Sequence, residues 1–85
     1  MAEPTKVQKE ILKEVLEGWL ENESEILNDA FNYEITRREF NVRFTQMVNV
    51  AIILEQVVGV EGRVLTLHEE WPLDRRESRM ENLQP

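Results

Sequence analysis

The chain has one place where an imidazole stands beside carboxylates, at His68, Glu69 and Glu70. Such groups could bind a metal ion or exchange protons with a substrate. Adjacent side chains on a helix or strand point in different directions, however, and the sequence has no second histidine and no cysteine to complete a metal site. Phosphate-binding loops, glycine-rich dinucleotide turns and Gly-x-Ser-x-Gly elbows are also missing from it. We therefore expect no catalytic residue, no cofactor, no metal site and no small-molecule substrate, and predict that the chain is not an enzyme.

Carboxylates recur at helical spacing near the N-terminus. Glu10, Glu14, Glu17 and Glu21 lie three or four residues apart, which places them on one face of a helix. Three interpretations of this acidic row are open: a solvated helix face, a docking surface for a basic protein, and a mimic of nucleic-acid phosphates. The third rests on spacing, because carboxylates one helical turn apart stand about 5–6 Å from each other, which is of the same order as phosphates along a strand.

The C-terminal part contains a basic cluster and a tryptophan. Arg75, Arg76 and Arg79 could pair with the acidic helix of the same chain or of a second copy, contact an acidic partner, or be solvated. Trp71 stands directly before Pro72 and follows a run of acids. It is therefore a candidate both for a packed anchor and for an exposed anchor that binds a partner.

The net charge of −7 is concentrated in one stretch of the sequence. Residues 10–34 contain eight acids and a single base, Lys13, whereas acids and bases balance elsewhere. Neutralising phosphates requires an excess of Lys and Arg, so we expect no direct binding of nucleic acid and none of anionic membrane. No basic flank precedes an apolar run at the N-terminus, and no apolar run approaches the ~20 residues of a membrane span. The expected location is the cytoplasm.

Two segments at the N-terminal end should hold the acidic row in place. Apolar residues at helical spacing predict a helix over residues 6–22, begun by a capping box between Thr5 and Gln8. The periodicity is lost at residues 22–24, which predicts a break. Ser24 is a suitable N-cap for a short second helix over residues 25–33.

The longest apolar pattern predicts a central helix over residues 35–58. Thr36 and Glu39 have the spacing of a capping box, and Ile35 and Phe40 that of a hydrophobic staple. Gly59 is a natural helix stop. The apolar surface of this helix is so wide that it needs cover on two sides. Its second apolar row contains the residues that we expect to contact a partner, namely Val50, Ile53 and Val57.

After Gly59 the chain should be rich in turns. Residues 64–67 are β-prone and could form a hairpin, or Thr66 and Glu69 could cap one helical turn. A helix over residues 75–83, capped by Asp74, has few apolar anchors and should be solvated and marginal. We therefore expect one domain over residues 1–85, with an ordered core at about 5–71 and a marginal tail at 72–85.

The predicted fold is all-α: a small three-helix domain with a long central helix and a turn-rich C-terminal extension. We reject a DNA-binding helix-turn-helix domain, since the third helix would be too apolar and too poorly charged to contact bases in a DNA groove. Domains of this size are marginal alone, and the 85 residues include no cysteine for a disulfide.

Our first hypothesis is a non-enzymatic interaction or regulatory module that forms a homodimer through its apolar helix surface. The alternative is a small acidic inhibitor of viral or mobile-element type that blocks a nucleic-acid-binding enzyme.

Overall fold

The computed structural model describes residues 5–85, so residues 1–4 of the expected domain lie outside the described residues. The helices are α1 (Lys6–Asn28), α2 (Arg37–Ile53), the π-helical segment η1 (Leu54–Val58), α3 (Arg63–Glu70) and α4 (Leu73–Glu81). Within this range there is no strand, and the all-α prediction is confirmed. None of the helices over residues 5–85 has the length and apolar composition needed to cross a membrane.

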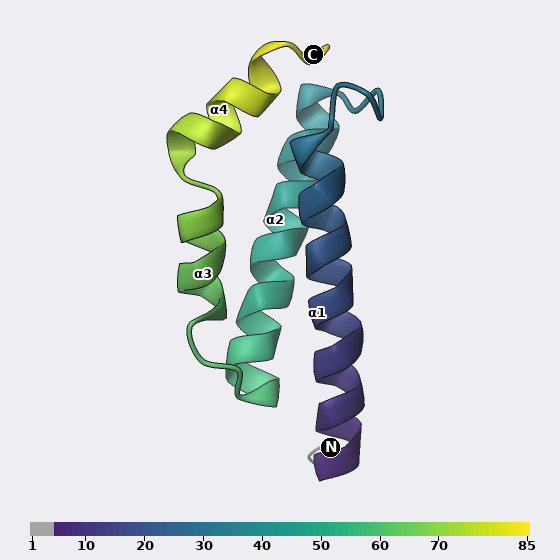
Figure 1. The fold of residues 1–85 in the computed structure, drawn as a ribbon, viewed down its shortest axis with the longest axis vertical. Coiled ribbons are helices and arrows are strands. Elements are labelled where there is room, and N and C mark those ends of the chain that lie inside the picture. Colours follow the sequence, from purple (N-terminus) through teal and green to yellow (C-terminus); the bar gives the residue numbers. More distant parts are fainter. Residues whose placement is uncertain (1–4) are drawn as a thin grey trace.

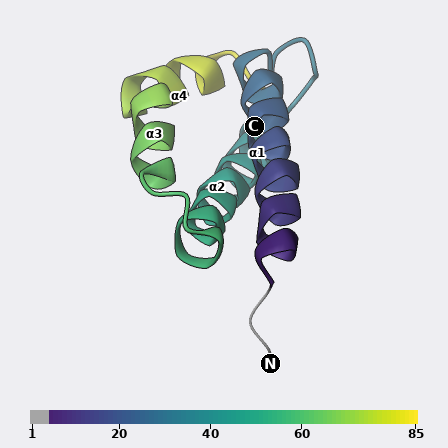
Figure 2. The same ribbon diagram turned by 60° about the horizontal axis from the view of Figure 1, so that its bottom comes forward.

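The helices form an elongated molecule of 44 × 21 × 20 Å. α1 runs antiparallel to α2, and α3 lies on the other side of α2 (Figure 1). The view turned by 60° shows the same order, with α2 between α1 and the arc made by α3 and α4 (Figure 2). The predicted count of three helices is wrong, because the segment after Gly59 contains two helices and the two helices predicted before residue 34 are one.

The N-terminal helix starts as predicted and ends later than predicted. Thr5 Oγ1 accepts a hydrogen bond from the Gln8 amide at 3.1 Å, and the Thr5 amide donates to Gln8 Oε1 at 2.8 Å. α1 then continues through residues 22–24 to Asn28. Ser24 is not a cap, since its hydroxyl accepts a hydrogen bond from the Trp71 indole N–H at 3.0 Å. Tertiary contacts therefore hold the helix where local periodicity fails.

The central helix begins at Arg37, two residues later than predicted, and its helical structure ends at Val58 as predicted. Thr36 Oγ1 accepts a hydrogen bond from the Glu39 amide at 3.1 Å, whereas the Glu39 carboxylate accepts one from Arg43 Nε at 3.3 Å instead of reaching back to the cap. The last turn widens into η1, and the chain leaves the helix at Gly59, whose φ of 84° suits glycine. The sequence pattern does not distinguish this π-helical end from an α-helix.

The C-terminal segment is helical and is tied to the start of α2. Residues 72–85, expected as a marginal tail, contain α4 and bring Leu83 into the core at 5% exposure. The Arg37 amide donates to the Gln84 carbonyl at 2.7 Å, and its guanidinium donates to the carbonyls of Met80 and Glu81 at 3.2 and 3.1 Å. These bonds join the start of α2 to the C-terminal end of α4 and the residues after it.

The core lies between α1, α2 and α3, and Trp71 is its largest fully buried side chain. The indole meets the rings of Phe40 and Phe44 edge-on, with centroids 6.0 and 6.1 Å away. Such edge-to-face pairs are favourable beyond the area that they bury. The buried apolar cluster comprises Leu27, Ala30, Ile35, Phe40, Phe44, Met47, Ala51, Leu67, Trp71 and Leu83.

Candidate functional site

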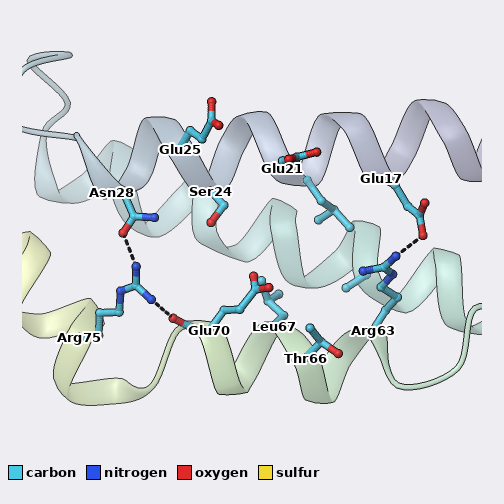
Figure 3. A pocket seen from close by; sticks show the side chains of 12 residues that line it. Glu17, Glu21, Ser24, Glu25, Asn28, Arg63, Thr66, Leu67, Glu70 and Arg75 are labelled. Carbon is cyan, nitrogen blue, oxygen red and sulfur yellow. Dashed lines mark hydrogen bonds and ion pairs between the residues drawn. The ribbon is translucent and has the colours of Figure 1, made fainter.

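A groove with a volume of about 520 Å³ runs between α1 and α3, above α2. Figure 3 shows α1 and α3 as its two walls. Leu20, Ala51 and Leu67 supply its apolar lining. All the other lining residues are polar or charged: Glu17, Glu21, Ser24, Glu25, Asn28, Arg63, Thr66, Glu70 and Arg75.

Two arginines tie the walls of the groove together. At one end Arg63 forms an ion pair with Glu17, which joins α3 to α1. At the other end Arg75 donates to Asn28 Oδ1 at 2.7 Å and to the backbone carbonyl of Glu70. Its guanidinium also lies over the Trp71 ring, 4.9 Å from the centroid. Figure 3 shows both connections, which span the groove from α1 to the C-terminal helices.

The arginines of the predicted basic cluster have separate surroundings. Arg75 takes part in the groove contacts described above, and Arg76 lies over the Phe44 ring with 4.5 Å to the centroid. Arg79 is exposed. Among residues 5–85, the base that pairs with the acidic row is Arg63, which the sequence did not single out. No local pattern marks it, because its partner lies 46 residues away along the chain.

The acidic row is divided by this contact. Glu17 is partly buried against Arg63, whereas Glu10, Glu14 and Glu21 are exposed. Within the described part of the chain these three carboxylates take part in no ion pair. Glu17 is therefore a structural residue, and the other three form a solvent-facing acidic edge of α1.

A second ion pair, between a buried glutamate and a partly exposed arginine, joins α1 to α2. The Arg43 Nη1 atom lies 2.8 and 3.1 Å from the two carboxylate oxygens of Glu23, which is only 6% exposed. Desolvation alone would lower the pKa of Arg43, but the hydrogen bonds and charges of Glu23 and Glu39 outweigh it and raise the pKa above the ordinary arginine value. The guanidinium therefore stays charged, and the pair fixes the alignment of the two helices.

Two further sites weighed from the sequence have clear positions. Trp71 is 0% exposed and is a core residue, not an exposed anchor for a partner. His68, Glu69 and Glu70 are exposed on α3. Over residues 5–85, no group of three or more His, Cys, Asp or Glu side chains is arranged to hold a metal ion.

Large aliphatic side chains are exposed on the side of α1 and α2 opposite the groove. Leu20 of α1 and Ala51 of α2 both line the groove. At about 100° per residue, Ile11 stands about 180° around α1 from Leu20. On α2, Val42 and Ile53 stand about 180° and 200° from Ala51. Since α1 and α2 are neighbours, these side chains emerge together on the far side of the two-helix layer.

We call this surface the apolar face. Exposure is 58% for Ile11 and 60% for Val15 on α1, and 52%, 42% and 43% for Val42, Ile53 and Val57 on α2 and η1. Val50, the third predicted contact residue of the central helix, is half-buried. α3 and α4 lie along the other side of α2, so they leave this face open. The apolar face is defined by Ile11, Val15, Val42, Ile53 and Val57.

The wide apolar pattern of the central helix is thus divided between two environments. One side, with Phe40, Phe44 and Met47, is buried in the core, and the other contributes to the apolar face.

The sequence matches no protein-family model, and comparison with curated proteins and with solved structures gives no match.

Proposed function

We propose that this chain is a non-enzymatic protein–protein interaction module that forms a homodimer through its apolar face. The observation that supports the proposal is the exposure of five large aliphatic side chains, between 42% and 60%, on one side of two adjacent helices. Scattered apolar residues are ordinary on protein surfaces, whereas these five are gathered on one side of two packed helices. Exposed apolar side chains gathered on one face of a small domain are typical of interaction sites.

A second copy is the partner that this face suits best. The residues of α2 between Val42 and Ile53 on this side are the exposed amides Gln46 and Asn49, so the middle of the face has polar but uncharged side chains on α2. A two-fold contact uses the same patch on both copies, and such dimers are the commonest closed assemblies. Self-association would also enlarge the hydrophobic core of a domain that is small for independent stability.

Sedimentation equilibrium over a range of micromolar concentrations tests the proposal. We expect the weight-average mass to rise with concentration from one chain toward two. A mass of one chain throughout this range would contradict self-association. Added salt should change the equilibrium only modestly, because salt screens exposed charges at the rim of the contact but does not weaken apolar burial.

A second candidate function is supported by the exposed acidic edge of α1. Glu10, Glu14 and Glu21 face solvent and lie on one helical surface. This arrangement would allow the chain to occupy the basic groove of a nucleic-acid-binding enzyme and block it. The distinguishing measurement is competition: an enzyme captured by the chain in this way should be released by duplex DNA and by raised salt.

A further inference from the structure

We propose that the homodimer has a two-fold axis parallel to α1 and α2, so that α1 of each copy lies on α2 of the other. The result is an antiparallel four-helix bundle with α3 and α4 on its two outer sides. This inference rests on the proposed self-association and specifies its geometry. It is carried by the open apolar face, the charges of the two helices and the register that the Glu23–Arg43 pair sets.

Two closed arrangements can cover the face. α1 and α2 form a layer of two antiparallel helices (Figure 1). When two such layers meet face to face, an axis parallel to the helices places α1 on α2 of the partner copy, and neighbouring helices are antiparallel throughout. An axis across the helices places α1 on α1 and α2 on α2 instead.

Charge favours the first arrangement. α1 carries six acids and three bases, whereas α2 carries three arginines and one acid. Contact between α1 and α1 would bring two acidic helices together, and contact between α2 and α2 would bring two basic ones together. Placing α1 on α2 pairs an acidic helix with a basic one twice in each dimer, and such complementarity selects the orientation of a contact.

Two exposed residues at the rim of the apolar face, Arg38 and Glu25, could form an ion pair between the two copies in this arrangement. Arg38 lies one turn before Val42 on α2, and among residues 5–85 it takes part in no ion pair. The other arginines of α2 are engaged, Arg37 with C-terminal carbonyls and Arg43 with carboxylates. Arg38 is therefore the basic group of α2 that remains for a partner.

Glu25 is the corresponding acid on α1. Glu25 is at the edge of the groove lining, and about 40° around the helix from Ile11, so it lies between the groove and the apolar face. Figure 3 shows its carboxylate on the side of α1 turned away from α3.

The Glu23–Arg43 pair sets which residues of α1 and α2 share a level. Because the two helices are antiparallel, a residue that follows Glu23 is level with one that precedes Arg43 by the same number of positions. Glu25 is therefore level with Asn41, which is within one turn of Arg38. A two-fold axis parallel to the helices preserves levels, so Arg38 of one copy would reach Glu25 of the other.

The same register aligns the apolar residues. Ile11 precedes Glu23 by as many residues as Glu55 follows Arg43, so Ile11 is level with Glu55. Ile53 and Val57 flank Glu55 and belong to the apolar face. In the proposed dimer Ile11 of one copy therefore packs against the η1 end of the other.

Disulfide trapping tests this geometry directly, because the chain contains no cysteine of its own. Ile11→Cys and Val57→Cys are made in separate chains that carry tags of different size, then mixed and oxidised. We expect the mixed Ile11→Cys–Val57→Cys dimer to form at least about tenfold faster than a disulfide between two Ile11→Cys chains, since only the mixed pair meets the Cα separation that a disulfide requires.

The outcomes separate the geometry from the proposed function. If Ile11→Cys or Val15→Cys chains cross-link with themselves in preference, α1 lies on α1 and this inference is overturned, while self-association stands. If the unmodified chain remains a monomer, the proposed function fails before the geometry is tested.

Charge exchange gives an independent measurement. Arg38→Glu and Glu25→Arg should each weaken the dimer about fivefold to tenfold, since each removes two rim ion pairs and creates like-charge contacts. The doubly exchanged chain should recover the dissociation constant of the unmodified chain to within about twofold. Weakening without recovery would overturn the pairing of Arg38 with Glu25.

Discussion

The guanidinium of Arg43 holds the buried carboxylate of Glu23 through Nη1, at 2.8 and 3.1 Å from its two oxygens. The pair joins α1 to α2 at a point where the sequence predicts a break in α1. We expect Arg43→Met to lower the free energy of unfolding by about 2–3 kcal/mol, because it leaves the Glu23 carboxylate buried without a cation. This value is below the roughly 3–5 kcal/mol that breaking a fully buried ion pair costs, because Arg43 is partly exposed.

Urea unfolding followed by circular dichroism measures this effect. Arg79→Met is the control, since Arg79 is exposed on α4 and forms no ion pair in the described chain. A loss of equal size in both variants would show that the Glu23–Arg43 pair is not the cause. Each variant is compared at a concentration where the oligomeric state of both is known.

Trp71 should be the most sensitive core position. Trp71→Ala removes a side chain that is 0% exposed and contacts Phe40 and Phe44, and should cost about 3–5 kcal/mol. Ser24→Ala should cost only about 1 kcal/mol, because it removes the hydrogen bond to the indole and keeps the packing. Thermal and urea unfolding compare the two. An effect below 1 kcal/mol for Trp71→Ala would contradict its central place in the core.

The apolar face should control self-association without controlling the fold. Ile53→Asp should abolish dimer formation, since a carboxylate desolvated in the contact would have no partner there. Leu65→Asp is the control, because Leu65 is 69% exposed on α3 and lies outside the apolar face. Sedimentation equilibrium reports the dimer, and circular dichroism reports the helices. Equal loss of dimer in both variants would exclude the apolar face as the specific contact.

The exposed acidic edge should be dispensable for folding. Replacing Glu10, Glu14 and Glu21 by Gln should keep or slightly raise stability, by about 0.2–0.5 kcal/mol, because it removes like charges spaced one helical turn apart. Glu17→Gln should instead lower stability, since it breaks the ion pair with Arg63.

The same triple variant tests the second candidate function. If a nucleic-acid-binding enzyme is the target, its capture should be lost in the triple Gln variant and retained in Ile53→Asp. Retention by the triple Gln variant would exclude the acidic edge as the contact. Once an enzyme has been captured, surface plasmon resonance at two salt concentrations measures its binding to the triple Gln variant and to Ile53→Asp.

The sequence by itself determined the features whose partners are close along the chain. The helix starts at Thr5 and Thr36 depend on hydrogen bonds to residues three positions away, and the stop at Gly59 depends on the backbone freedom of one residue. The all-α class follows from apolar periodicity, which is also local. Such features can be recognised in a short window of sequence.

Only the tertiary structure decided the features whose partners are distant. The Ser24 hydroxyl accepts a hydrogen bond from the indole of Trp71, 47 residues away. Ser24, which the sequence predicts as an N-cap, therefore lies inside α1. Arg63 pairs with Glu17 across 46 residues, which removes one carboxylate from the acidic row. The side of α2 that remains open is likewise set by where α3 and α4 pack. Periodicity reveals that a helix has a wide apolar surface, but how much of it is buried depends on neighbours that the chain supplies only when folded.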